Sequence, residues 1–289
     1  MKSLRKYLPH ILLIITIILV IGIFYSVYTR QSTNNNLLKV AFLDVGQGDA
    51  IYVEAPNGKQ MLFDAGPGPL VLQKLAEVMP FGDRSIDMIV ITNPDKDHIG
   101  GFIDVLENYD VDLVLEPGTK KDTLVYKNLE EEIINQNIKK EIARRGMIIN
   151  LDTTKNIYFD VLFPDRDVSN FDVNDGSIVG KLVYGSQSYM LTGDSTKYTE
   201  LLIKNNEDPL TLTASVLKLG PHGSRTSTSV LWLEQVRPEL AIISAGKNNS
   251  YGHPHKDILD RLNSFNIPYL GTYQNGTIIL KTDGVSIFQ

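Results

Sequence analysis

Acidic and histidine side chains crowd into one short segment, "TNPDKDHIGG" at residues 92–101. Asp95, Asp97 and His98 follow the apolar run "IDMIVI" within a few positions, so the loop is expected to leave a buried strand and to open a helix. Carboxylate and imidazole groups that converge at such a point can bind a divalent cation. The alternative is that Asp95 or Asp97 only caps the helix, as aspartate often does.

Three other segments deliver similar side chains at the ends of expected strands. They are "LFDAG", "MLTGDS" and "LKLGPHGSRTSTS", which carry Asp64, Asp194 and His222. Taken singly, each of these residues is explained as well or better by a turn or a loop. Taken together with residues 92–101, four strand ends that supply carboxylates and imidazoles favour a divalent cation held by nitrogen and oxygen ligands.

The pattern along the rest of the chain predicts the framework for these loops. Short β-type runs separated by "GQG" and "PNG" turns come first, and helices and strands then alternate to the end. The charged stretch at residues 122–145 is expected to be one long helix. No internal repeat or second linker interrupts the pattern, so residues 38–289 are predicted to form one α/β (α+β) domain, with two mixed sheets face to face and helices outside.

The first thirty residues have a different composition. Basic residues precede an apolar run at 8–28 in which no residue carries a full charge, and about 20 such residues cross a bilayer as a helix. A cleaved signal peptide is the alternative, but no clear small-x-small cleavage site follows. We therefore predict a cytoplasmic stub and one transmembrane helix over residues 1–30, and a linker over 31–37. Positive charge before the span places the domain outside the cytoplasm, as in a single-pass protein of the cell membrane.

Charge and composition limit the classes of function. The chain has 28 basic and 34 acidic residues, and residues 1–30 hold four of the basic ones and none of the acidic ones. The remainder carries a formal charge of −10, which excludes a general polyanion-binding surface and restricts any nucleic-acid contact to a local or cation-bridged one. The sequence has no cysteine, so a thiolate metal site and a cysteine nucleophile are excluded.

The ordered set of motifs resembles a known family. Asp64, "TNPDKDHIGG", "LTGD", "HGS" and "SAGKNNSYGHPH" resemble the motifs of metallo-β-lactamase-fold hydrolases, in particular the extracytoplasmic hydrolase domain of the ComEC/Rec2 competence proteins. The opening "FLDVGQGDAIYVEAPNGKQMLFDAG" is similar as well, and the likeness covers about residues 38–282. It implies a four-layer αββα sandwich, in agreement with the pattern of strands and helices, and a metal-dependent hydrolase.

Two positions depart from the motifs of that family. The pattern T-H-x-D-x-D-H-x-G-G has Asn93 in place of its first histidine, and H-H-G-S is present as "PHGS", with Pro221 in place of a histidine. An amide oxygen is a much poorer ligand for zinc or manganese than an imidazole. We therefore expect one divalent ion, zinc or manganese, in preference to two, and hydrolysis that is reduced or lost.

The resemblance assigns roles to the residues that match. The implied metal ligands are Asp95, Asp97, His98, Asp194 and His222. Asp194 matches the aspartate that bridges two metals in the family, Asp64 matches the one that supports the site, and Asn93 is grouped with Asp64 behind the ligands. The candidate catalytic residues are Asp97, His253 and His255.

Hydroxyl and guanidinium groups beside the expected metal centre are candidates for binding a substrate. Ser224, Arg225 and Thr226 offer hydrogen-bond donors to phosphate oxygens. The hydroxyls are equally suited to cap a helix that begins near residue 227, because serine and threonine are common at that position. Both interpretations stay open at this point.

The intact motif "YGHPH" places His253 and His255 on either side of a proline, before an expected helix. A histidine in such a place can act as a general acid or hold a phosphate. The alternative is that both histidines only support the metal ligands.

Two classes of function compete. The first is a membrane-anchored, extracytoplasmic hydrolase of phosphodiesters, such as a nuclease, linked to DNA uptake. The second is a non-catalytic binding module with the same fold, which the two lost histidines favour; a hydrolase of another ester, such as a lactone or thioester, is a third. The expected partners are the membrane through residues 8–28 and DNA or a nucleotide as substrate. With one expected span in the chain, the participation of a separate channel subunit stays open.

Overall fold

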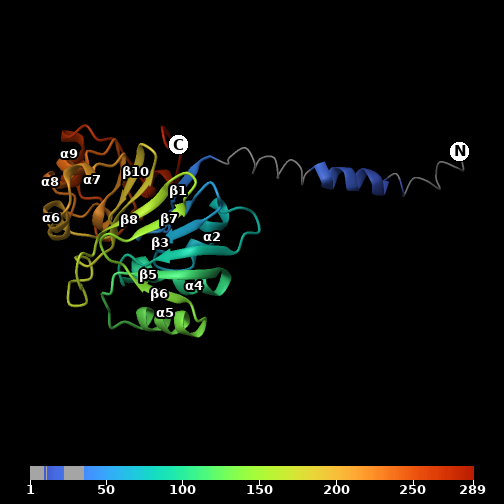
Figure 1. Ribbon diagram of the computed structural model, residues 1–289, viewed down its shortest axis with the longest axis horizontal. Coiled ribbons are helices and arrows are strands. Elements are labelled where there is room, and N and C mark those ends of the chain that lie inside the picture. Colours follow the sequence, from blue (N-terminus) through green and yellow to red (C-terminus); the bar gives the residue numbers. More distant parts are fainter. Residues whose placement is uncertain (1–9, 11, 23–35) are drawn as a thin grey trace, which may run out of the picture. The chain divides into compact units, whose positions relative to one another are not determined.

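The computed structural model describes residue 10, residues 12–22 and residues 36–289. The chain divides into two units, Met1–Leu37 and Leu38–Gln289. The second unit contains the strands of both sheets and the helices that cover them (Figure 1).

In the N-terminal unit, residues 12–22 are helical. Among the residues described, no helix is both long enough and apolar enough to span a membrane. The span predicted at residues 8–28 and the linker predicted at residues 31–37 lie partly outside the described residues, so both stay predictions.

The first sheet contains the N-terminal strands and the end of the chain. Its strands are β1 (Leu38–Phe42), β2 (Ile51–Glu54), β3 (Gln60–Phe63), β4 (Ser85–Val90), β5 (Asp110–Glu116), β6 (Lys139–Ile142), β14 (Ile278–Thr282) and β15 (Ile287–Phe288). In the described part of the chain it has eight strands, in the order β15-β14-β1-β2-β3-β4-β5-β6. The strands from β15 to β3 pair antiparallel, and those from β3 to β6 pair parallel.

The second sheet is likewise made of an antiparallel part and a parallel part. Its strands are β7 (Ile148–Asp152), β8 (Ile157–Phe163), β9 (Val179–Tyr184), β10 (Gln187–Leu191), β11 (Val216–Lys218), β12 (Leu240–Ile243) and β13 (Tyr269–Gly271). Among the described residues it has seven strands, in the order β13-β12-β11-β10-β9-β8-β7. Those from β7 to β10 pair antiparallel and those from β10 to β13 pair parallel.

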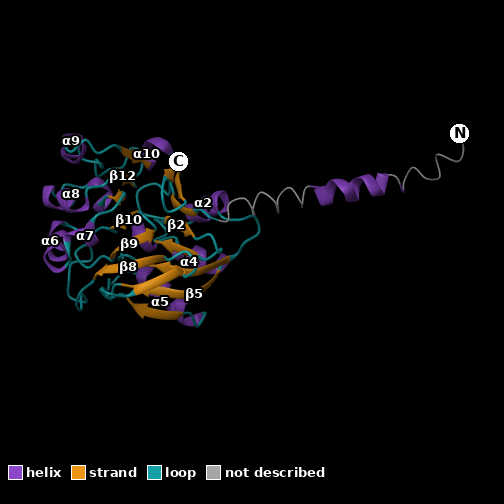
Figure 2. Cartoon of the chain, turned by 45° about the horizontal axis from the view of Figure 1, so that its top comes forward, coloured by secondary structure: helices purple, strands orange, loops and turns teal. Residues whose placement is uncertain are grey.

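Helices cover the outer face of each sheet (Figure 2). The helices that pack on the first sheet are α2 (Leu70–Val78), α4 (Phe102–Asn108) and α5 (Leu124–Asn135), with the short α3 (Lys96–Ile99) before α4. Those on the second sheet are α6 (Lys197–Asn206), α7 (Pro209–Leu212), α8 (Val230–Val236) and α9 (Lys256–Ser264). The short helices η1 (Gly220–Gly223) and α10 (Thr272–Asn275) follow β11 and β13.

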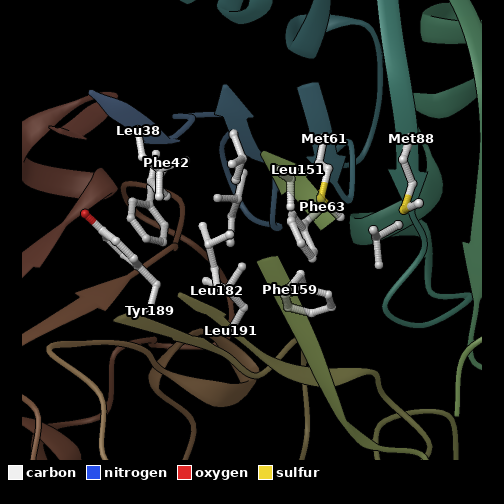
Figure 3. Packing of buried hydrophobic residues seen from close by; sticks show 14 of the residues in the cluster. Leu38, Phe42, Met61, Phe63, Met88, Leu151, Phe159, Leu182, Tyr189 and Leu191 are labelled. Carbon is white, nitrogen blue, oxygen red and sulfur yellow. The ribbon is translucent and has the colours of Figure 1, made fainter. Parts of the chain in front are cut away.

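The central core lies between the two sheets (Figure 3). Phe63 on β3 and Phe159 on β8 meet edge to face, with ring centroids 4.9 Å apart. In β1, Val40 and Phe42 face this central core, whereas Ala41 packs under the helices. Alternate side chains of one strand therefore enter two different cores, which explains why such strands are apolar at almost every position.

Helix, sheet, sheet and helix form the four layers, so the predicted two-sheet sandwich with outer helices is confirmed. A separate apolar core lies between each pair of neighbouring layers, because both faces of each sheet are buried.

The long helix predicted at residues 122–145 is wrong. α5 ends at Asn135, and β6 with the sequence "KKEI" pairs in parallel with β5 at the edge of the first sheet. Charged side chains on an edge strand oppose its pairing with another sheet. The same charges resemble the solvent-facing side of a helix, and this resemblance hides the strand in the sequence.

Candidate metal centre

The strand ends singled out in the sequence meet at one edge of the sandwich. Asp64 follows β3, the segment 91–95 follows β4, Asp194 follows β10 and His222 lies in η1 after β11. Both β3–β4 and β10–β11 are parallel neighbours, and the carboxyl ends of parallel strands are a common position for a site. The two sheets therefore contribute residues to one cluster.

Glycine allows the backbones to come this close at two positions. A Cβ on Gly101 would lie 2.2 Å from the carbonyl oxygen of Ala65, and a Cβ on Gly193 would lie 2.8 Å from the side chain of Thr92. Gly193 also has a φ of 49°, which favours glycine. Gly101 thus lets two loops of the first sheet pack closely, and Gly193 lets the loop after β10 pack against the loop after β4 of the other sheet.

Four side chains converge through their outer atoms. Nε2 of His98 lies 3.3 Å from Oδ2 of Asp194, and Nε2 of His222 lies 3.5 Å from the same oxygen. Nε2 of His222 is also 3.2 Å from Oδ2 of Asp97. Ligand atoms of Asp97, His98 and His222 all lie within 4.8 Å of one another, which is compact enough for one cation.

The His98 ring is oriented from behind by Asp64. Its Nδ1 donates to Oδ2 of Asp64 at 2.7 Å, and Asp64 in turn accepts from the backbone N and the hydroxyl of Thr92 at 2.8 and 2.6 Å. In a neutral imidazole this arrangement leaves the lone pair on Nε2, toward Asp194. Asp64 thus lies behind His98, and its role in supporting a metal ligand stays a prediction.

The His222 ring is oriented in the same way by the backbone. Its Nδ1 donates to the carbonyl oxygen of Ser244 at 2.9 Å, so its Nε2 also carries the free lone pair in the neutral form. His222 has a φ of 49° inside η1. The two histidines thus present the same atom to the same side of the cluster.

Asn93 and Asp95 are not part of this convergence. The fully buried Asn93 accepts the backbone N–H of Asp95 on its Oδ1 at 2.9 Å and lies within 3.4 Å of the Ser177 hydroxyl. The carboxylate of Asp95 pairs with Lys121, and Asp95 is in none of the ligand clusters found among the described residues. The structure thus does not bring Asp95 together with the other expected ligands, and its role as a ligand stays a prediction.

The alternative interpretation, in which an aspartate of this loop caps the helix, differs from the structure in the side chain that makes the bond. Asp95 occupies the N-terminal cap position of α3, but its side chain makes no cap hydrogen bond. The side chain that satisfies a backbone donor at this turn is that of Asn93. Asn93 therefore acts as a turn-forming residue at the start of the helix.

Opposite charges dominate the electrostatics of the cluster. Burial alone would raise the pKa of Asp194, but the imidazoles of His222 and His98 lower that pKa well below its usual range. Burial would lower the pKa of His222, yet Asp194 and Asp49 raise it to about 10. Likewise, carboxylates raise the pKa of His98 well above its usual value against burial. Protons on the imidazoles thus balance the carboxylates when no metal is bound, and a divalent cation would displace them.

Two buried charged residues that sequence reasoning missed lie beside the histidines. Asp49, in the loop between β1 and β2, has Oδ1 at 3.5 Å from Nδ1 of His222 and Oδ2 at 3.8 Å from Nδ1 of His98. Its carboxylate pairs with the fully buried Lys218 of β11. A lysine inside the apolar run "VLKLG" was the signal available in the sequence, because a charge on a buried strand requires a buried partner.

The residues present fit a divalent metal ion. Nε2 of His98 is buried and has no hydrogen-bond partner among the described residues. Buried polar atoms of this kind are costly unless a ligand or ion satisfies them. Two imidazole nitrogens together with the carboxylates of Asp97 and Asp194 form a donor set typical of zinc or manganese.

The predicted substrate contacts lie in a turn beyond His222. The hydroxyl of Ser224 accepts from the backbone N and the hydroxyl of Thr226 at 3.3 and 3.1 Å. Arg225 donates to Asp257 at 2.9 Å. α8 begins later than expected and is capped by Ser229, so capping of a helix near residue 227 does not explain these residues, and their contact with a phosphate stays a prediction.

His253 lies next to the cluster and His255 next to the predicted substrate contacts. The His253 ring is 6.2 Å from that of His222 and stacks on Tyr251 at 5.7 Å. Burial and the neighbouring histidines lower the pKa of His253 to about 4, so it is neutral at pH 7 and is better suited to hold a group than to act as a cationic acid. Nδ1 of His255 accepts the backbone N–H of Arg225 at 3.2 Å, which leaves its proton on Nε2.

The class of protein follows from comparison with known families. The sequence profile described as the Metallo-beta-lactamase superfamily matches residues 43–247, and the chain belongs to that superfamily. The fold is similar to that of Igni18, a metallo hydrolase from Ignicoccus hospitalis, with 14% identity, a TM-score of 0.52, and coverage of 84% of this chain and 98% of that one. It is also similar to a long form RNase Z from yeast, with 12% identity, a TM-score of 0.50, and coverage of 85% and 42%.

Relatives of higher identity are competence proteins, which confirms the resemblance found in the motifs. ComE operon protein 3 of Bacillus subtilis is 34% identical over 262 residues, 83% of this chain and 32% of that protein. Recombination protein 2 of Haemophilus influenzae is 30% identical over 83% of this chain and 28% of its own length, and competence protein ComA of Neisseria gonorrhoeae is 29% identical over 87% and 33%. The chain thus spans about a third of the length of these relatives.

Proposed function

We propose that residues 38–289 are a metal-dependent hydrolase that binds one divalent ion, zinc or manganese, and cleaves phosphodiesters. The observation that carries the proposal is the convergence of Nε2 of His98 and Nε2 of His222 on one oxygen of Asp194. Asp64 and the Ser244 carbonyl bind the Nδ1 atoms of His98 and His222, so that both Nε2 atoms are directed at the same point. This orientation of both rings has a purpose where a ligand binds between them. Such an arrangement is typical of metal-binding histidines.

Each residue of the cluster has a distinct task in this proposal. Asp97, His98, Asp194 and His222 would hold the ion. Asp64 and the Ser244 carbonyl fix the rings of the two histidines. When bound, a divalent ion in such a site supplies the Lewis-acid chemistry for hydrolysis.

The number of ions follows from how the loop 93–95 is used. A second ion in the family arrangement would depend on the residue at position 93, where Asn93 instead bonds the backbone of Asp95. The carboxylate of Asp95 pairs with Lys121. Both groups are engaged within the protein, which supports a single ion.

The substrate class rests on the relatives and on the groups beside the cluster. Names such as recombination protein and competence protein support DNA or a nucleotide as substrate and a link to DNA uptake. His253 would contact the phosphate as a neutral imidazole, with Ser224, Arg225, Thr226 and His255 further out. With a domain of net negative charge, the contact would be local and made through these groups and the ion.

The cellular setting is part of the same proposal. The apolar run at residues 8–28 would anchor the chain in the cell membrane, with the basic residues before it on the cytoplasmic side and the domain outside. A separate channel subunit is a candidate partner in this setting.

A non-catalytic binding module is the second candidate. The use of Asn93 as a turn residue favours it, because that position no longer offers an imidazole to a second ion. One metal supplies only part of the charge stabilisation that a two-metal centre gives to phosphoryl chemistry. Binding without turnover is the outcome expected of this candidate.

A metal and cleavage assay on the full chain in detergent micelles separates the candidates. Manganese or zinc content is measured first, and cleavage of single-stranded DNA and of a nucleotide follows at several metal concentrations. We expect bound metal and metal-dependent cleavage that Asp97→Ala abolishes, whereas Asp112→Ala, at an exposed carboxylate on β5, leaves it unchanged. Bound metal without cleavage indicates the binding module, and no recruitable metal contradicts the proposal.

A further inference from the structure

Lys218 brings a permanent positive charge into the middle of the centre. It lies on β11 between β10 and β12, and its side chain is fully buried. Its Nζ donates to the carboxylate of Asp49 and to the carbonyl oxygen of Gly193 at 2.7 Å, and it lies 3.8 Å from Oδ1 of Asp194. Three oxygens from two segments, the loop after β1 and the turn Gly193–Asp194, therefore lie around one ammonium.

The two carboxylate oxygens of Asp194 face two different cation positions. Oδ2 faces the Nε2 atoms of His98 and His222, at 3.3 and 3.5 Å. Oδ1 faces Lys218 and has no hydrogen-bond partner among the described residues. Oxygens of carboxylates and of a backbone carbonyl are also the ligands that hard divalent cations prefer.

We propose that the Lys218 ammonium is a built-in cation of the centre, which fills an all-oxygen position that a second divalent ion would otherwise take. Asp194 then offers only Oδ2 to a metal, and the centre holds one divalent ion. The inference rests on the proposed metal binding and explains its stoichiometry by a residue of this chain rather than by a lost histidine alone.

Charge balance agrees with this role. Asp49, Asp64, Asp97 and Asp194 give four negative charges in the cluster, and Lys218 gives one positive charge. With neutral imidazoles and one divalent ion, the net charge is −1. Without the ammonium, two divalent ions would be needed for neutrality, whereas next to the ammonium a second divalent ion is repelled at short range.

Lys218→Ala tests the proposal, because it removes the ammonium and leaves its three oxygens and the space. The full chain in detergent is titrated with manganese, and bound ions are counted by native mass spectrometry alongside thermal unfolding. We expect one ion in the unchanged protein and two in Lys218→Ala, with a Tm that falls without metal and recovers with manganese. Lys181→Ala is the matched control, since the half-buried Lys181 donates to the carbonyls of Thr211 and Thr213, and this variant should bind one ion.

If Lys218→Ala does not fold, a second pair of variants tests whether the Lys218 ammonium competes with a metal ion. Asp49→Asn leaves the Lys218 ammonium with Asp194 as its nearest carboxylate, so it should compete with the metal and weaken manganese binding by about tenfold or more. Asp49→Asn/Lys218→Met removes both charges and should restore the affinity. Equal affinity in the unchanged protein and in Asp49→Asn would overturn the proposal.

The outcomes for the unchanged protein separate this inference from the proposed function. No bound manganese or zinc overturns both. Two bound ions in the unchanged protein, or one ion in a folded Lys218→Ala, overturn only the role of Lys218. One ion in the unchanged protein and two in Lys218→Ala support it.

Discussion

The two halves of the segment 93–98 differ in what their side chains bind. Asp97 and His98, in the second half, face His222 and Asp194, and their neighbours hold them in place. Asn93 and Asp95, in the first half, are engaged by a backbone amide and by Lys121. One loop thus has a half whose side chains face the histidine and aspartate cluster and a half whose side chains are engaged within the turn and by a lysine.

The largest expected effect contrasts two aspartates of this loop. Asp97→Ala removes a proposed ligand and should weaken manganese binding by about 100-fold or more. Asp95→Ala removes only a partly exposed ion pair with Lys121 and should change the affinity by less than about threefold. Isothermal titration of both variants checks the contrast. A loss of affinity in Asp95→Ala as large as that in Asp97→Ala would show that the halves do not differ.

A substitution behind the ligands should have the next largest effect. Asp64→Asn weakens the bond that orients His98, and loss of such support typically costs about 10–100-fold in metal affinity. Titration with zinc measures it, with Asp110→Asn at an exposed position on β5 as control. An unchanged affinity would mean that the ring of His98 does not need its partner.

The pH dependence of stability should reverse between the metal-free and the metal-bound protein. The pKa of His222 rises from 6.5 to about 10 in the folded state, so its contribution is present below pH 6.5 and is lost as pH rises toward 10. The Tm of the chain in EDTA should therefore fall over this range. With manganese, deprotonated imidazoles bind the ion, and the Tm should hold or rise. Thermal unfolding with and without metal checks this, and parallel curves would contradict it.

The smallest expected effect comes from rebuilding the family histidine. Asn93→His removes the acceptor for the backbone N–H of Asp95 and should destabilise the protein by about 1 kcal/mol. The number of bound ions should stay at one, because Lys121 still holds Asp95. Denaturant unfolding and native mass spectrometry measure both, with Asn108→His at the exposed end of α4 as control. A second ion in Asn93→His would show that the first half needs only its histidine.

The sequence was sufficient to predict the clustering of those acidic and histidine residues that directly follow an expected strand. Asp64, Asp194 and His222 each follow an apolar run, and the parallel pairing of those runs brings them together. Local pattern determines where a strand ends, and topology brings parallel ends to one edge of the sandwich.

Long-range pairing accounts for what the sequence did not reveal. The partner of Asp95 is Lys121, 26 residues away across β5, and the partner of Asp49 is Lys218, 169 residues away. The lysine in "VLKLG" signals that a buried partner exists, but nothing local identifies that partner, because an acidic residue in a loop can equally be a ligand or half of an ion pair. The strand β6 was missed for a similar reason, since only its pairing with β5 distinguishes it from a charged helix.

X-ray absorption at the zinc edge tests the central claim most directly, because it reports the ligands and any neighbouring metal together. The full chain is loaded with two equivalents of zinc and then dialysed. We expect scattering from two imidazoles, with nitrogen and oxygen ligands at about 2.0–2.2 Å, and no metal–metal distance of about 3.5–4 Å. A metal–metal distance in that range, or zinc bound without the two imidazoles of His98 and His222, would contradict it.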